Sequence, residues 1–325
     1  MTGAKKIEGE TVNTNKKIDF GVYLPQLAFS FEDVVARAQC ADRLGYHSMW
    51  FLDHFYPPYM PGVGSFEAWT TICALAPLTE RIRLGHLVLC NAFRHPALLA
   101  KMAASFDVIS KGRLELGLGT GSVPREFGEF GIPLPSFAER TAQLEESIQI
   151  MKSMFSNEAT TFDGKYYQLK DAPLSPKPLQ KPWPPITIGG SGEKYTLPLV
   201  ARHADVWNCP TYGAGELEKK IAIVHDECRH IGRDPATLRM SEQSVLVIVK
   251  DRSQLDAALA KARRHYGGKE YGLEEAGYIG TPADIIERIK ERSALGISLM
   301  MFFFYDRADL KTLELFGNEV LPAFA

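Results

Sequence analysis

The sequence predicts an α/β fold, a (β/α)8 TIM barrel with insertions in its loops, and three observations support it. Short runs of apolar, β-branched and aromatic residues alternate with amphipathic stretches at helical spacing. Eight such units follow one another without a break in composition, as expected for parallel strands covered by helices. The 325 residues, 45% of them hydrophobic, can bury the core of one such domain. A doubly wound Rossmann-type sheet shares the alternation and is the alternative fold.

The first four units are bounded by turn residues. The run "KIDFGVYLP" stops at Pro25, and the amphipathic stretch that follows lies between the N-cap candidate Ser30 and Gly45. The strands expected in this half are 17–25, 47–54, 81–90 and 113–121. The helices expected in this half are 30–46, 65–79, 95–113 and 137–155.

The last four units have the same signals. Their expected strands are 186–190, 205–209, 243–250 and 297–305. Their expected helices are 193–204, 215–232, 281–296 and one at the end of the chain, where Pro198 kinks the first of these or marks a late start. A typical barrel needs about 250 residues. The surplus fits a flexible arm at 1–17, ahead of a single barrel domain at 18–325, with insertions at about 157–185 and 251–280.

Composition excludes several classes of partner. A net charge of −2 gives no electrostatic reason to bind nucleic acid or an anionic membrane. The five cysteines are scattered, odd in number and without CxxC spacing, which is typical of reduced thiols. No apolar run has transmembrane length and no signal-peptide core precedes the first strand, so we expect a cytoplasmic protein. No metal site is expected, because His225 and His230 point to different faces of a helix.

An acid and a histidine stand together at the end of the second expected strand. The apolar run "SMWFL" leads directly to Asp53 and His54, and prolines follow. The carboxyl end of a barrel strand opens on the face where barrel enzymes place their chemistry. Histidine titrates near neutrality and can exchange a proton with a reacting group. We therefore interpret the pair as catalytic; the structural alternative is that Asp53 caps a loop and His54 packs.

Two glycine-rich runs follow later strands. "GLGTGSVPREFGEFG" (117–131) lets backbone approach a ring or a phosphate, but it lacks Rossmann spacing. "IGGSGEKYT" (188–196) leads into a helix and exposes N–H groups to an anion, with Lys194 and Thr196 beside them. A plain tight turn is the alternative for the second run.

A series of motifs now appears in order. They are "GVYLPQ", "ADRLGYHSMWFLDHF", "LTERIRLGHLVLCNAFRHPALLAKMAASFDVISKGRLELGLGTG", "EFGIPLPSFAERTAQLEESIQIMKSMF", "FDGKYYQL", "PLQKPWPPITIGGSGEKYTLPLVARHADVWN" and "GTPADIIERI". The chain resembles the luciferase-like flavin and deazaflavin oxidoreductases, which are (β/α)8 barrels, and most of all the subgroup that uses coenzyme F420, an 8-hydroxy-5-deazaflavin. The likeness runs from about residue 18 to the C-terminus and is weakest over 250–275.

The resemblance implies hydride transfer between coenzyme F420 and a small organic substrate. It places Asp53 and His54 beside the reactive carbon, with His54 exchanging a proton and Asp53 orienting the histidine or the ring. It also implies a non-proline cis peptide, Leu87–Val88, that presses on the back of the ring. The other residues that it assigns to the cofactor, the last six of them around its phosphate, are Cys90, Asn91, Gly119, Thr120, Gly121, Arg125, Gly190, Ser191, Gly192, Glu193, Lys194 and Thr196. Glu126 is expected near the loop that holds Arg125.

Two departures argue against one substrate of this family. The sugar-phosphate dehydrogenases have a tryptophan shortly after "DHF" and a glutamate after "GTG", whereas this chain has Pro58 and Ser122. Sugar-phosphate oxidation is therefore not expected. An FMN-dependent monooxygenase of the same fold and a non-catalytic flavin-binding barrel are the alternative functions, and relatives imply a homodimer.

Overall fold

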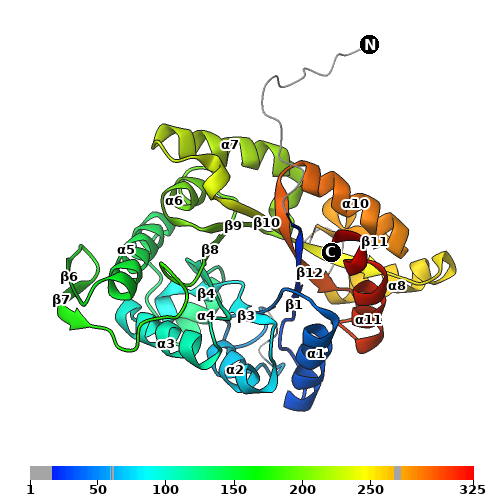
Figure 1. The fold of residues 1–325 in the computed structure, drawn as a ribbon, viewed down its shortest axis with the longest axis horizontal. Helices are drawn as coiled ribbons and strands as arrows, with labels where there is room; N and C mark the ends of the chain where they lie inside the picture. Colours follow the sequence, from blue (N-terminus) through cyan, green and yellow to red (C-terminus); the bar gives the residue numbers. More distant parts are fainter. Residues whose placement is uncertain (1–16, 59, 61, 267–271) are drawn as a thin grey trace, which may run out of the picture.

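A computed structural model of the chain describes residues 17–58, 60, 62–266 and 272–325, so residues 1–16 of the expected arm lie outside the described part. Eight of the described strands form a closed parallel barrel (Figure 1), as predicted. Each strand pairs with the next, β9 pairs with β10, and β12 pairs with β1 to complete the ring. The eight strands are β1 (Asp19–Tyr23), β2 (Ser48–Phe51), β3 (Arg83–His86), β5 (Leu114–Gly119), β8 (Ile186–Gly189), β9 (Val206–Cys209), β10 (Arg239–Ile248) and β12 (Ile297–Phe304).

Helices surround the barrel on the outside (Figure 1). They are α1 (Phe31–Leu44), α2 (Ala68–Leu75), α3 (Pro96–Ile109), α5 (Phe137–Ser156), α6 (Thr196–His203), α7 (Leu217–His230), α10 (Pro282–Ala294) and α11 (Leu310–Glu319). Local chemistry fixes their ends. Ser30 and Asp33 form a capping box that begins α1, and Gly45 ends it in the left-handed region at φ 88°. No helix of the described residues is long and apolar enough to cross a membrane.

Three elements differ from the sequence expectation. The run 81–90 is two strands, β3 and β4 (Leu89–Cys90), because the backbone turns between them at Leu87 and Val88. The strand expected at 243–250 begins earlier, at Arg239, because its first residues pair with β9 and β12. The second helix is shorter than 65–79, since it begins after its N-cap Glu67 and continues as a 3₁₀ turn at Ala76–Leu78.

The two expected insertions contain regular structure that the sequence did not reveal. In the first, β6 (Ala159–Asp163) and β7 (Gln168–Pro173) form an antiparallel hairpin. In the second, α8 (Leu255–Tyr266), α9 (Leu273–Ala276) and β11 (Tyr278–Gly280) occur, and β11 pairs with β10. The insertions therefore extend the barrel without opening it.

Alternate residues of each strand pack into two apolar layers, one between the barrel and its helices and one inside the barrel. Met49 packs with helix residues such as Ala38 and Ile72, between the barrel and its helices. Its neighbour Trp50 belongs to the second cluster, with Leu299 and Met301. This alternation follows from the two-residue period of a strand. The barrel interior is thus a packed core, and ligands must bind at one of its ends.

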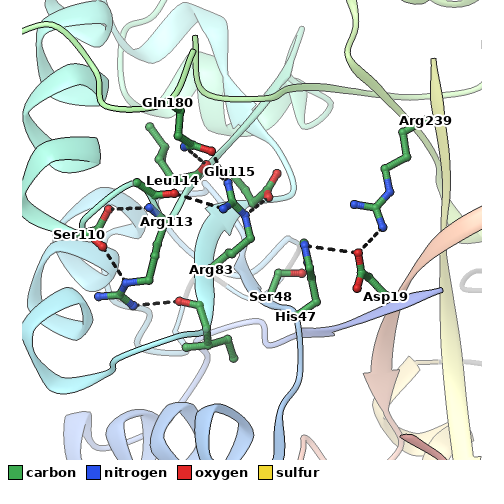
Figure 2. Close-up of polar contacts among 12 residues, drawn as sticks. Asp19, His47, Ser48, Arg83, Ser110, Arg113, Leu114, Glu115, Gln180 and Arg239 are labelled. Atoms are coloured by element: carbon green, nitrogen blue, oxygen red, sulfur yellow. Dashed lines mark hydrogen bonds and ion pairs between the residues drawn. The ribbon is translucent and has the colours of Figure 1, made fainter. Parts of the chain in front are cut away.

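Charged side chains occupy the N-terminal end of the strands (Figure 2). Arg239 Nη2 donates to Asp19 Oδ2 at 2.6 Å, and His47 Nε2 lies 3.6 Å from the same oxygen. Arg83 pairs with Glu115 on the neighbouring strand. Because these charged groups pair between strands of the barrel and tie them together, we assign this end a structural role.

Candidate active site

His54 lies in the loop after β2, at the C-terminal end of the barrel, and a buried carboxylate holds its ring. Its Nδ1 is 2.8 Å from Oε2 of Glu126. The histidine side chain is 19% exposed, whereas that of Glu126 is 1% exposed. The other oxygen of Glu126 accepts the backbone N–H of Phe55. With Nδ1 engaged, Nε2 is the nitrogen that can exchange a proton with a ligand.

Glu126 comes from the short helix α4 (Pro124–Glu129), which follows β5. Pro124 begins this helix, where a missing N–H has no cost. The helix carries Glu126 across to the loop after β2, a separation of 72 residues from His54 along the chain. The sequence led us to expect Asp53 to orient the histidine or the cofactor ring. The imidazole is held by Glu126 instead, and the side chain of Asp53 contacts Cys90 and Arg94.

Asp53 is 5% exposed and accepts three hydrogen bonds. Arg94 binds it with both terminal nitrogens, at 2.8 and 2.9 Å, and the backbone N–H of Cys90 donates at 2.8 Å. Arg94 also donates to Glu67 Oε1 at 2.7 Å. Burial lowers the pKa of Arg94, but Asp53 and Glu67 outweigh this effect and raise it. Asp53 thus ties the end of β2 to β4 and to the N-cap of α2.

Gln26 supports the same loop from the end of β1. Its side chain is fully buried. The amide nitrogen donates to the carbonyl oxygens of Leu52, at 2.7 Å, and Phe66, at 2.9 Å. Its carbonyl oxygen accepts the N–H of Leu52 at 3.2 Å. These contacts fix the backbone that immediately precedes Asp53.

The peptide bond between Leu87 and Val88 is cis, as the resemblance implies. Glycines make room for the Val88 side chain at the ends of β5 and β8. A Cβ added to Gly119 would lie 2.5 Å from Val88 Cγ2, and one added to Gly189 would lie 3.1 Å from Val88 Cγ1. Larger residues at these glycines would displace Val88. The glycines at the end of β5 therefore leave space for the Val88 side chain, in addition to any space that they leave for a ligand.

Cys90 and Asn91 follow this bond, and both are 5% exposed. Burial raises the pKa of the Cys90 thiol to about 12, so it is protonated at neutral pH. Asn91 Nδ2 donates to Tyr167 Oη at 3.3 Å, which joins the first insertion to the site. Cys90 is thus joined to Asp53 through its backbone N–H, and Asn91 is joined to the first insertion.

β5 ends at Gly119, and the loop that follows begins with Thr120 and Gly121. Gly121 adopts φ 81°, and an added Cβ would lie 2.6 Å from the ring of Phe127 and 2.8 Å from Cys90 Sγ. Arg125 lies farther out: it is 57% exposed and its Nε donates to Glu129 at 2.6 Å. The structure thus brings the glycines to the site and places Arg125 at its rim.

The loop between β8 and α6 is tightly wound. The N–H groups of Thr196 and Leu197 both donate to the oxygen of Gly192 at 3.0 Å. Gly190 adopts φ 129°, and Trp207 Nε1 donates to its oxygen at 2.8 Å. The loop is therefore anchored to β9. Ser191 is half-buried, and the next three residues, Gly192, Glu193 and Lys194, are exposed.

Lysines gather around this loop. Glu193 binds Lys219 Nζ at 2.7 Å and Lys220 Nζ at 2.6 Å. These hydrogen bonds lower the pKa of Glu193 to about 2. Lys194 Nζ lies 5.1 Å from the centre of the Tyr195 ring. Because Lys219 and Lys220 are paired with Glu193, the glycine backbone and Lys194 are the donors that this loop offers to an anion.

Four residues of the site had no assigned role at the sequence level: Gln26, Glu67, Arg94 and Glu126. The only local signals are the glutamine that ends "GVYLPQ", the N-cap position of Glu67 and the arginine of "FRHP". Arg94 is 41 residues from Asp53 along the chain. Barrel closure brings such residues together, so only the register of the strand ends could have paired them.

Comparisons with known proteins agree on a family. The luciferase-like monooxygenase family matches residues 14–298. A Beutenbergia cavernae protein named F420-dependent glucose-6-phosphate dehydrogenase is 32% identical over 323 residues, 90% of this chain and 94% of the relative. The F420-dependent hydroxymycolic acid dehydrogenase of Mycobacterium tuberculosis is 30% identical over 242 residues, 73% of this chain and 65% of the relative. A solved F420-dependent secondary alcohol dehydrogenase with an F420–acetone adduct has a TM-score of 0.82 at 22% identity, covering 95% of this chain and 99% of that one.

The structural likeness supports the fold, and the family match covers most of the chain. The relative at 32% identity extends over nearly the whole length of both proteins. The chain therefore belongs to the luciferase-like monooxygenase family, and its curated relatives named above are F420-dependent dehydrogenases.

Proposed function

We propose that this chain is an oxidoreductase that transfers a hydride between coenzyme F420 and a small organic substrate. The observation that carries the proposal is the imidazole of His54, held at Nδ1 by Glu126 at the catalytic end of the barrel. The curated relatives are named as F420-dependent dehydrogenases, which supports the same chemistry.

The residues present fit this cofactor. When bound, the deazaflavin supplies a ring carbon that accepts or donates a hydride. The glycine–serine loop at 190–192 and the exposed Lys194 would hold its anionic groups. Val88, with Cys90 protonated and buried beside it, would give the ring an apolar support.

His54 manages the proton that accompanies the hydride. During oxidation of an alcohol, the hydride would be taken by the bound deazaflavin, and the hydroxyl proton would pass to His54 Nε2. During reduction of a carbonyl group or an enone, the imidazolium returns that proton. The carboxylate of Glu126 stabilises the imidazolium by its charge and keeps the ring in place. Asp53 and Arg94 hold the loop in position without touching the ring.

Glucose 6-phosphate is not part of this proposal. In the dehydrogenases that oxidise it, the resemblance places a tryptophan and a glutamate where this chain has Pro58 and Ser122. In the described loops beside His54, Arg125 is paired with Glu129. The described part of these loops therefore offers no unpaired cation to a sugar phosphate.

Anaerobic turnover tests the proposal. The purified chain is mixed with oxidised coenzyme F420 and a panel of secondary alcohols, and with reduced F420 and a panel of ketones and enones. Loss or gain of deazaflavin absorbance that needs both the chain and a substrate supports it. Oxygen consumption with reduced FMN, without any F420 reaction, contradicts it and favours the monooxygenase alternative.

We also propose a homodimer in the cytoplasm. The five cysteines are unpaired, which fits a reducing compartment. Light scattering on the purified chain tests the dimer, and a monomer at micromolar concentration would contradict it.

A further inference from the structure

Four phenylalanines form an aromatic shelf beside His54: Phe55, Phe93, Phe127 and Phe130. The rings of Phe55 and Phe130 stack with centroids 4.0 Å apart and planes 10° apart. Phe93 lies 4.8 Å from Phe55, and Phe127 lies 5.7 Å from Phe93. The shelf therefore joins the loop after β2, the 3₁₀ turn at Asn91–Phe93 and the helix α4.

The outer half of this shelf is open to solvent. Phe55 is 43% exposed and Phe130 is 48% exposed, whereas Phe127, at 1%, anchors the shelf to the core. The stacked rings of Phe55 and Phe130 therefore leave apolar surface exposed to water. Exposed apolar patches of this kind usually mark a binding surface.

The position of the shelf connects it to the proposed chemistry. Phe55 is the chain neighbour of His54, and Glu126 holds both the imidazole and the N–H of Phe55. Phe130 ends the helix that carries Glu126. Glu126 thus fixes both the imidazole of His54 and the backbone of Phe55, so the shelf begins at the residue next to the proton-exchanging one.

The charges next to the shelf neutralise one another. Arg125 Nε donates to Glu129, and Tyr56 Oη donates to the other oxygen of Glu129 at 2.5 Å. Among the described residues of α4 and the loop after β2, the arginine is therefore committed to an ion pair. An anionic substrate would find no unpaired cation there, whereas a neutral apolar group would replace water against the rings.

From these contacts we infer the substrate class, an inference that rests on the proposed function. The substrate is a neutral alcohol, ketone or enone that carries a planar aromatic or extended apolar group next to the reacting carbon. That group packs on Phe55 and Phe130 while the oxygen of the substrate meets His54. A second protein chain covering the shelf is the competing occupant, and it is an outcome of the test below.

Saturation-transfer NMR with two neutral ketones tests the shelf directly. The affinities of acetophenone and 2-butanone are measured on the full chain with saturating coenzyme F420. The wild type is expected to bind acetophenone more tightly. Phe130→Ser should weaken the affinity for acetophenone on the order of tenfold or more. It should leave the affinity for 2-butanone nearly unchanged, because only acetophenone carries the aromatic group that packs on the shelf. Phe130→Tyr keeps the ring and should restore acetophenone binding.

The matched control is Ile231→Ser, which removes an apolar side chain of equal exposure, 48%, at the C-terminal end of α7. It should leave both affinities unchanged. Equal loss of both ketones in Phe130→Ser, or tighter binding of glucose 6-phosphate than of acetophenone, would overturn the inference. A change of oligomeric state in Phe130→Ser with unchanged acetophenone affinity would overturn it in favour of a protein partner.

The same samples separate this inference from the proposed function. The affinity for F420 is measured by fluorescence in each variant. Tight F420 binding without any preference for acetophenone would refute the substrate class inferred from the shelf and leave the proposed function intact. Acetophenone binding that depends on Phe130, in a chain that does not bind F420, defeats the proposed function and leaves an aromatic binding site.

Discussion

The Oε2 atom of Glu126 lies 2.8 Å from Nδ1 of His54, and the glutamate is 1% exposed. A buried carboxylate this close fixes the orientation of the imidazole and leaves Nε2 free to exchange a proton. His54 comes from the loop after β2 and Glu126 from helix α4, 72 residues apart along the chain, and the pair gives the site one defined proton-exchanging atom.

His54→Ala should lower the rate of the chemical step by roughly 10²–10⁴, because a general acid or base contributes about that much. The affinity for F420 should change only severalfold, since the anion-binding loop is untouched. Single-turnover absorbance with saturating F420 measures the rate. An unchanged rate would remove His54 from the mechanism.

Glu126→Gln should lower the same rate by roughly tenfold, since it removes the charge that supports the imidazolium while keeping a side chain of equal size. This tenfold loss of rate should vanish in the His54→Ala background if Glu126 acts through the histidine. Glu129→Gln is the matched control, because Glu129 lies on the same helix and contacts Tyr56 and Arg125. Additive losses in the double variant would show an independent role.

Arg94→Met should destabilise the fold by about 3–5 kcal/mol, because it leaves the carboxylate of Asp53 buried without its partner. The Asp53 side chain is 4% exposed and that of Arg94 is 12% exposed. Arg125→Met breaks an exposed pair and should cost less than about 1 kcal/mol. Urea unfolding measures both. Equal midpoints for the two variants would refute a structural role for the Asp53–Arg94 pair.

Gly119→Ala should cost about 1–3 kcal/mol, because the new methyl group would lie 2.5 Å from Val88 Cγ2. Val88→Ala should remove most of this added cost in the double variant. Gly128→Ala is the control, since nothing lies within 4 Å of a Cβ at that exposed helical position. Thermal unfolding reports the three values. Independent effects of the Gly119 and Val88 substitutions would mean that the two residues do not share this space.

The sequence predicts the features that neighbouring residues determine, and it misses those that depend on contacts between distant residues. Strand ends, caps and the position of Asp53 and His54 depend on neighbouring residues, so periodicity and turn signals located them. Strand three was predicted as continuous because a backbone turn inside an apolar run leaves no local signal. The partners of Asp53 and His54 were missed because they depend on contacts between residues 41 and 72 positions apart.

The hairpin of the first insertion was missed for another reason. Its strands are mostly exposed and carry charged residues, so they lack the apolar alternation that marks a half-buried strand. The cis bond at Leu87–Val88 came from the resemblance, since its flanking residues carry no local signal for it.

Buried His86 should make stability depend on pH. It stacks on Trp69, with ring centroids 5.3 Å apart, and burial lowers its pKa from 6.5 to about 4. The unfolded chain therefore binds a proton between pH 6.5 and 4 that the folded chain does not. With respect to His86, the free energy of unfolding is constant above pH 6.5. It falls as the pH drops from 6.5 to 4 and is constant again below pH 4. His86→Phe should flatten the pH dependence of the unfolding free energy in this window, as urea titrations at several pH values would show. An unaltered slope would mean that the imidazole takes up a proton within the folded chain.

The most direct test of the central claim is a parallel fluorescence titration of the purified wild-type chain with oxidised coenzyme F420 and with FMN. We expect low-micromolar binding of F420, much weaker binding of FMN, and a loss of F420 affinity when Lys194 is replaced by alanine. Tight binding of FMN with weak binding of F420 would contradict it.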